Sequence, residues 1–116
     1  MAEFLRDRAD REEVAIELSL ESGPVRAGVK DLSVRGVGLT VENPGADLVR
    51  ELEGLTELFI KIIAGGTMLV ANARVAWKAL LTAGSGERVE MGLEITMIAP
   101  EDSLALAGII ERIRKA

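Results

Sequence analysis

The fold is decided by residues 14–42, which read VAIELSLESGPVRAGVKDLSVRGVGLTVE. Apolar residues alternate with polar or small ones three times in this stretch, and Gly23-Pro24 and Gly36 separate the alternating runs. A period of two is typical of a strand with one buried face, because successive side chains point to opposite sides of a sheet. We therefore predict three strands here, of which the first two form a hairpin.

The same alternation returns in the second half of the chain, where turn-forming glycines separate the runs. The three further runs are residues 56–63, 67–78 and 89–97. Six strands at such spacings are typical of an all-β barrel or sandwich. Between the third and fourth runs, residues 46–55 have a mixed pattern that fits either a helical turn or irregular structure.

The alternation also assigns side chains to the two faces of the predicted sheet. In the fifth run Trp77 has the parity of Leu69, and in the sixth run Met97 has the parity of Val89. Residues of one parity share a face, and the apolar face of such a strand is the one expected to be buried. We therefore predict that Trp77 and Met97 lie on the same face as the core residues of their strands.

The last segment changes period, and residues 100–115 are predicted to form a helix. Pro100 suits the first helical position, and the acidic residues that follow it lie near the positive end of the helix dipole. The apolar face of this helix holds Leu106, Ile109, Ile110 and Ile113. Such a face usually packs on its own domain, so we expect the helix to cap the barrel, the alternative being that it docks a partner.

The length of 116 residues suits a single domain. We expect it to consist of a flexible, arginine-bearing lead-in over residues 1–12, a barrel over residues 13–98 and the helix over residues 100–115. The first residues lack the apolar core of a signal peptide, and no run approaches the ~18 consecutive apolar residues of a membrane span. We therefore expect a cytoplasmic location and no membrane insertion.

The composition excludes several classes of active site. The chain contains no Cys and no His, which removes disulfides, cysteine-based zinc sites, the commonest metal ligand and the commonest general base. Most carboxylates alternate with apolar residues, as on a solvated strand face, and no pair stands out. We expect no enzyme, no metal and no cofactor. The net charge of −5 disfavours binding to a nucleic-acid polymer but leaves a small phosphorylated ligand open.

Two short segments stand out as candidate ligand-binding groups. The first carries Arg6, Arg8 and Arg11 ahead of the first strand, and arginine binds phosphates or the acceptor edge of guanine. The second is residues 31–36 (DLSVRG), which place an Asp and a Ser on the same side, two residues apart. Each has a simpler interpretation when taken singly. The arginines then pair with neighbouring acids in a solvated segment, and the Asp and Ser bond to local backbone amides.

In this order the two segments resemble the PilZ domain family. The resemblance continues through residues 73–77 (ARVAW), residues 91–95 (MGLEI) and the terminal helix, and covers residues 6–115. It implies a six-stranded antiparallel β-barrel with a C-terminal α-helix, and a receptor for the bacterial second messenger cyclic di-GMP. In that family a lead-in of the form RxxxR and a motif of the form [D/N]xSxxG make the nucleotide site.

The resemblance implies a role for each residue that matches these two motifs. Asp31 and Ser33 would hydrogen-bond a guanine, and Gly36 would keep the turn open. Arg11 matches the second arginine of the lead-in and would bind the guanine acceptor edge or a phosphate.

The lead-in departs from the family spacing at its first arginine. Asp7 stands four residues before Arg11, while Arg6 and Arg8 lie five and three residues before it. Two functions on the same fold therefore stay open. In the first, a non-enzymatic effector binds cyclic di-GMP, which orders the lead-in and alters the surface offered to a downstream protein partner. In the second, the domain binds no nucleotide and is a protein-interaction module in motility or pilus regulation.

Overall fold

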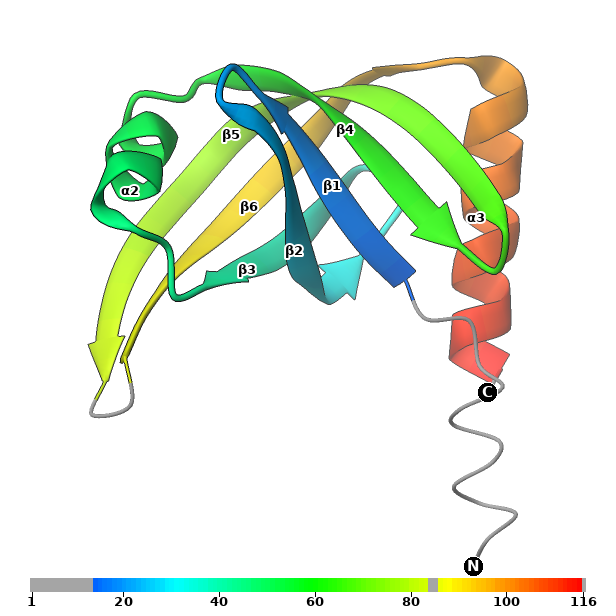
Figure 1. Ribbon diagram of the computed structural model, residues 1–116. Helices are drawn as coiled ribbons and strands as arrows, with labels where there is room; N and C mark the ends of the chain where they lie inside the picture. Colours follow the sequence, from blue (N-terminus) through cyan, green and yellow to red (C-terminus); the bar gives the residue numbers. More distant parts are fainter. Residues whose placement is uncertain (1–13, 84–85, 116) are drawn as a thin grey trace, which may run out of the picture.

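The computed structural model describes residues 14–83 and 86–115, which form a closed six-stranded antiparallel β-barrel with two helices (Figure 1). The strands are β1 (Val14–Leu20), β2 (Gly23–Leu32), β3 (Gly36–Glu42), β4 (Glu57–Ala64), β5 (Thr67–Ala83) and β6 (Gly86–Ile98). Helix α2 (Ala46–Glu53) follows β3, and helix α3 (Pro100–Lys115) follows β6. The predicted fold class, an all-β barrel with a C-terminal helix, is confirmed.

Every strand of the barrel pairs with two antiparallel neighbours. The order around the barrel is β1-β2-β3-β6-β5-β4, and the pairing of β1 with β4 closes it. The predicted hairpin of β1 and β2 is confirmed, with Leu20 opposite Gly23 at its turn. The pairing of β3 with β6 joins two strands that are far apart in the sequence. Only long-range contacts specify that pairing, because the alternation within a strand does not choose its partner.

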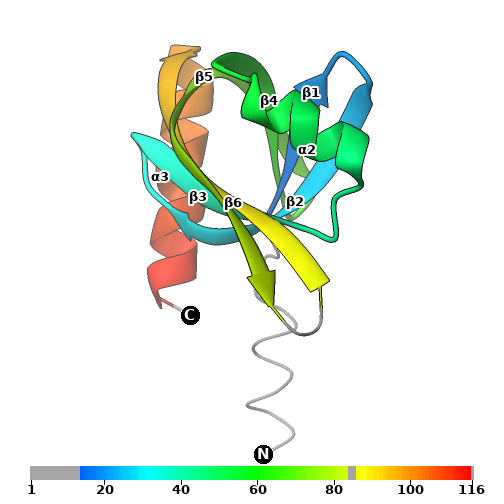
Figure 2. The same ribbon diagram turned by 90° about the vertical axis from the view of Figure 1, so that its left-hand side faces the viewer.

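Aliphatic side chains on the inward faces of the strands fill the barrel. The largest strand side chains without appreciable exposure are Ile16, Leu18, Leu39, Ile60, Ile62 and Met91. Side chains of both helices complete the core, and the helices lie at opposite ends of the barrel (Figures 1 and 2). Burial of these groups is the main contribution to folding stability, at about 25 cal/mol for each Å² of apolar surface removed from water.

Helix α3 packs its apolar face on the barrel from which it emerges. Leu106 is 0% exposed and Ile109 is 1% exposed, while Ile110 and Ile113 are partly buried against the same core. The expectation that this helix caps its own barrel is confirmed. Of the helices in the described part of the chain, none is long and apolar enough to cross a membrane.

The mixed segment that follows β3 forms the helix α2, which settles the alternative left open by its sequence. Leu52 anchors this helix in the core at 1% exposure. The Nζ atom of Lys78 in β5 donates hydrogen bonds to the carbonyl groups of Leu52 at 3.0 Å, Leu55 at 3.2 Å and Glu53. Carbonyls at the end of a helix lack partners within it, so a lysine there is stabilising. Lys78 thus fixes the end of α2 to the barrel.

Two β-bulges overturn the predicted orientations of Trp77 and Met97. Val75 pairs with Leu93 and Trp77 with Gly92, so Ala76 is an extra residue in β5. In the same way Thr96 is an extra residue in β6. Each bulge reverses which parity faces the core. Trp77 is consequently 51% exposed and Met97 is 68% exposed, so neither shares the face of the core residues before the bulge. Strand β5 also runs five residues beyond its predicted end at residue 78.

The packing of α3 predicts a large difference between two leucines of the same helix. Leu106→Ala should lower the free energy of unfolding by about 2–5 kcal/mol, because it leaves a cavity in the core. Leu104 is 76% exposed, and Leu104→Ala should change it by less than about 0.5 kcal/mol. Urea denaturation followed by circular dichroism measures both values. Equal losses would contradict the packing of α3 on the barrel.

Candidate functional site

A β-bulge in β2 turns Asp31 to the outside of the barrel. Val29 pairs with Leu39 and Asp31 pairs with Gly38, so Lys30 is an extra residue on β2. The Oδ1 atom of Asp31 accepts a hydrogen bond from the backbone N–H of Gly38 at 3.1 Å. The Oδ2 atom makes no hydrogen bond within the described part of the chain, and the residue is exposed. Asp31 therefore keeps acceptor capacity for a ligand.

Ser33 organises the turn between β2 and β3. Its Oγ atom accepts hydrogen bonds from the N–H groups of Arg35 and Gly36, both at 3.2 Å. Its own N–H donates to the carbonyl of Gly36 at 2.9 Å. The backbone contacts expected from the simpler interpretation of this motif are therefore present, for Ser33 as well as for Asp31. The turn holds both side chains in fixed, exposed positions on one surface.

Glycines form the floor beside this turn. A Cβ atom on Gly36 would collide with the backbone carbonyl of Leu93 in β6, so the close approach of β3 to β6 needs glycine there. A Cβ on Gly38 would lie 2.8 Å from the Oδ2 atom of Asp31. A Cβ on Gly92 would collide with the indole of Trp77. These three glycines, called the glycine floor below, carry no side chain, and the side chains of Asp31 and Trp77 extend over Gly38 and Gly92.

The cross-strand register shows how these residues are arranged. Asp31, Gly38, Gly92 and Trp77 are successive partners across β2, β3, β6 and β5. Asp31 thus stands at one border of the glycine floor and Trp77 at the other. Together with Ser33, Arg35 and Glu94, they line an open depression of about 300 Å³. Three of the predicted site residues, Asp31, Ser33 and Gly36, are brought together in it.

Trp77 is the residue of this surface that the sequence interpretation missed. Its indole lies over Gly92 and half of the side chain surface remains exposed. An aromatic ring that covers a glycine on the neighbouring strand stabilises the sheet and leaves a flat apolar face. The alternation placed Trp77 on the core face because the bulge at Ala76 leaves no mark in the pattern. The signal that could have indicated the outward orientation is a large aromatic residue, Trp77, opposite a glycine, Gly92, on the neighbouring strand.

An ion pair lies next to the depression. Arg74 of β5 and Glu94 of β6 are cross-strand partners, and the Nη2 atom of Arg74 contacts the Oε1 atom of Glu94. Both side chains are about half exposed, so solvent screens the pair and its contribution to stability is small. Its effect on the site is electrostatic, because it neutralises the carboxylate that lines the depression beside Asp31.

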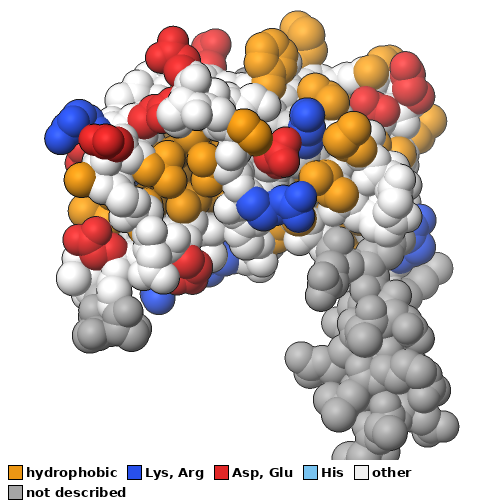
Figure 3. Space-filling view, viewed as in Figure 1, with side chains coloured by type: hydrophobic (Ala, Val, Ile, Leu, Met, Phe, Trp, Pro, Cys, Tyr) orange, Lys and Arg blue, Asp and Glu red, His pale blue; other side chains and the backbone are white. Residues whose placement is uncertain are grey.

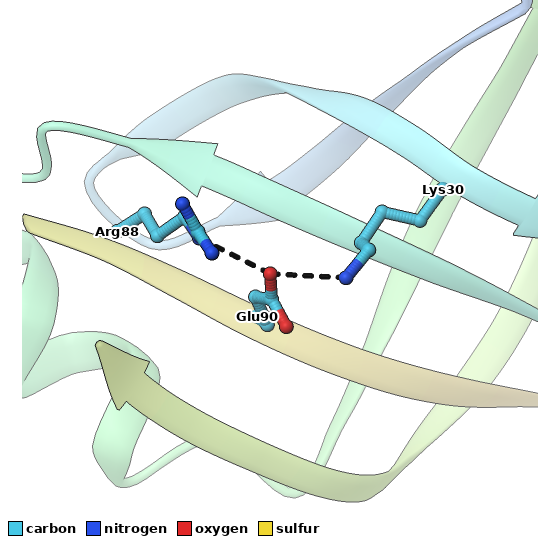
Figure 4. Close-up of polar contacts among 3 residues, drawn as sticks. All are labelled: Lys30, Arg88 and Glu90. Atoms are coloured by element: carbon cyan, nitrogen blue, oxygen red, sulfur yellow. Dashed lines mark hydrogen bonds and ion pairs between the residues drawn. The ribbon is translucent and has the colours of Figure 1, made fainter. Parts of the chain in front are cut away.

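A second charged cluster joins β2 to β6 across β3 (Figure 4). The Oε2 atom of Glu90 lies 3.0 Å from the Nζ atom of Lys30 and 3.1 Å from the Nε atom of Arg88. The hydrogen bond from Lys30 is the largest cause that holds the pKa of the Glu90 carboxyl below its ordinary value, and the charges of Lys30 and Arg88 act in the same direction. Lys30 is the bulged residue, so this cluster ties the bulge that turns Asp31 outward to β6.

The remaining predicted site residues, Arg6, Arg8 and Arg11, lie outside the described residues. The predicted flexible lead-in of residues 1–12 lies outside them as well. Within residues 14–83 and 86–115 no three acidic side chains gather as they would to hold a metal ion.

The sequence has no match among models of known protein families and none among curated proteins. Solved structures do match. The PlzA protein of Borreliella burgdorferi, in complex with c-di-GMP, has a TM-score of 0.62 at 11% identity over 96% of this chain and 49% of its own. The MrkH protein of K. pneumonia, in its apo state, has a TM-score of 0.65 at 16% identity over 90% of this chain and 50% of its own.

The chain has a PilZ-like fold. The matches cover 96% and 90% of this chain, at sequence identities so low that they concern the fold alone. The chain spans about half the length of each of these two proteins. In the PilZ-like barrel described above, the DxSxxG motif lies at the turn between β2 and β3 and borders the glycine floor.

The close approach at Gly36 predicts that a single methyl group will disturb the site. Gly36→Ala should lower the free energy of unfolding by about 1–3 kcal/mol, because the added Cβ forces β3 away from the Leu93 carbonyl. Gly28→Ala is the matched control, since a Cβ there meets the Cγ2 atom of Thr40 at 3.5 Å and its carbonyl oxygen at 3.9 Å, both ordinary contact distances. Thermal and urea unfolding of both variants test this. If Gly36→Ala loses no more unfolding free energy than Gly28→Ala does, the close approach of β3 to β6 does not require glycine at residue 36.

The lowered pKa of Glu90 predicts a pH-dependent contribution to stability. A carboxyl whose pKa is lower in the folded than in the unfolded chain stabilises the fold above its ordinary pKa of about 4.3. That contribution disappears as the pH falls through the lowered value. The difference in melting temperature between wild type and Glu90→Gln should therefore be largest near neutral pH and shrink toward pH 3.

The control for this measurement is Glu21→Gln. Glu21 is exposed at the turn between β1 and β2 and makes no ion pair with another described residue. Its variant should show the same melting temperature as wild type across the series. A wild-type advantage over Glu90→Gln that stays constant down to pH 3 would contradict an electrostatic role for Glu90.

Proposed function

We propose that this chain is a non-enzymatic receptor for cyclic di-GMP and that Asp31, Ser33 and Gly36 form part of its nucleotide site. The observation that carries the proposal is the turn of the DxSxxG motif at the edge of an open, glycine-floored depression. The match of the fold to PlzA, a protein solved in complex with c-di-GMP, supports it.

The groups around the depression suit a guanine base. The N1–H and N2–H₂ groups of guanine are donors, and the exposed carboxylate of Asp31 has acceptor capacity left for them. The half-exposed indole of Trp77 at the opposite border offers a flat face for base stacking, a contact worth about 1–3 kcal/mol per base in nucleic-acid complexes.

The lead-in has its own role in this proposal. Arg11, with Arg6 or Arg8, supplies positive charge for the phosphates and the guanine acceptor edge. Binding then orders the lead-in over the outer face of the barrel and alters the surface that a downstream protein partner meets. A cytoplasmic location belongs to the same proposal, because the sequence shows no apolar core of a signal peptide and no apolar run of membrane-spanning length.

A second candidate function has a specific observation in its favour. The outer face of β4 and β5 carries exposed hydrophobic side chains, with Phe59 at 54%, Met68 at 58% and Val70 at 45% exposure, and Met97 of β6 adjoins them (Figure 3). Exposed apolar surface of this kind is found at protein–protein interfaces. In this alternative the domain binds no nucleotide and the patch docks a protein in motility or pilus regulation.

Calorimetric titration with cyclic di-GMP separates the two functions. We expect saturable binding to the wild type at micromolar or lower concentration, and no heat with GMP. Asp31→Asn should weaken the binding at least tenfold, because the amide keeps an acceptor for the Gly38 N–H but loses the charge and an acceptor for guanine. The same residue change at the exposed Asp47 of α2 is the control and should bind as wild type does.

The titration also has a result that would overturn the receptor proposal. An absence of heat with wild-type protein at high nucleotide concentration would favour the interaction module. If wild type and Asp31→Asn bind with equal affinity, the domain is still a nucleotide receptor, but the DxSxxG motif is not part of its site.

A further inference from the structure

Arg35 lies inside the motif, between Ser33 and Gly36, at the junction of two hollows on the outer face. It lines the depression above the glycine floor. It also lines a neighbouring open hollow of about 420 Å³, which lies between Val34 and the end of β6. Glu94 is the other residue common to both. A side chain at this junction can reach a group of a ligand that lies in either hollow.

The backbone of Arg35 is fixed while its side chain is exposed. Its N–H donates to the Oγ atom of Ser33 at 3.2 Å, and its carbonyl accepts from the N–H of Ile95 at 2.7 Å. The turn is thereby attached to β6. A guanidinium that extends from a fixed backbone position loses less conformational freedom on binding than one on a free segment.

The charge of Arg35 is not compensated by an ion pair with any described residue. Among the described residues that line the glycine-floored depression, it carries the one positive charge. The nearby carboxylate of Glu94 is already paired with Arg74. An arginine that is exposed, unpaired and positioned beside a concave surface is suited to recognise an anion.

We infer that Arg35 binds a phosphate group of the ligand. This inference rests on the proposed function and assigns the motif a phosphate contact in addition to its guanine contacts. Phosphate oxygens are acceptors only, so they need donors, whereas the Asp31 carboxylate is suited to the guanine N–H groups. Arg35 supplies the phosphate donor from the barrel itself. This charge does not depend on the lead-in, where Asp7 stands four residues before Arg11.

The test compares variants of the full chain by titration with cyclic di-GMP at low and at high salt. Arg35→Gln should raise the dissociation constant roughly 10- to 100-fold, which is the effect of losing one charge-assisted hydrogen bond. Arg35→Lys should recover part of the loss, because it keeps the charge without the planar fork. The affinity of Arg35→Gln should also fall less with added salt than that of wild type, since one screened charge contact is missing.

The matched control is Arg26→Gln. Arg26 is an exposed arginine of β2 that stands opposite Glu17 in the register of β1 and β2 and does not line either hollow. Its variant should keep the wild-type dissociation constant and salt dependence. Melting temperatures of both variants should equal that of wild type, which separates a ligand contact from a structural role. The single Trp of the chain, Trp77, provides an independent fluorescence signal of binding at the depression.

The possible results are distinguishable. An Arg35→Gln variant with weaker binding and a smaller salt dependence than wild type, beside an unchanged Arg26→Gln, supports the phosphate contact. If wild type and Arg35→Gln bind within about twofold of each other, the inference about Arg35 is overturned and the receptor function stands. If the wild type binds no cyclic di-GMP, both the proposed function and the role of Arg35 are overturned.

Discussion

Closure of the barrel is the constraint on which the rest of this structure depends. Every strand pairs with an antiparallel neighbour on each side, although β5 pairs with β4 only as far as Arg74 and continues to Ala83 on β6 alone. A closed sheet must bend, and β-bulges supply the bends because an extra residue increases local twist. The three extra residues are Lys30, Ala76 and Thr96. Each one also exchanges the inward and outward faces of its strand.

The candidate site is a consequence of these face exchanges. The bulge at Lys30 turns Asp31 outward, and the bulge at Ala76 turns Trp77 outward on the opposite side of β3 and β6. The two residues between them in the register are Gly38 and Gly92, and the Asp31 carboxylate and the Trp77 indole lie over these two glycines. The same geometry that lets the barrel close therefore produces a polar-edged surface with an aromatic border. Lys30, which makes the bulge, is in turn fixed by Glu90.

The two surfaces that carry the alternative functions are neighbours on the barrel. One cross-strand row, formed by Glu57, Arg74, Glu94 and Gly36, separates the glycine floor from the row that contains Phe59 and Met97. A ligand in the depression and a protein on the apolar patch would therefore both contact β5 and β6. The two helices lie at opposite ends of the barrel (Figure 1), and no residue of either helix lines the depression.

Local patterns in the sequence specify the strands, the first hairpin, the terminal helix and the DxSxxG motif. These features follow from local periods and turn residues, because burial of one face imposes a period of two on a strand and of 3.6 on a helix. The tertiary structure alone decided the pairing of β3 with β6, the helical form of residues 46–53 and the outward orientation of Asp31, Trp77 and Met97. The reason is physical. A bulge or a distant strand partner is selected by the closure of the whole sheet, and one extra residue leaves the local alternation unchanged while it reverses the face of every residue that follows.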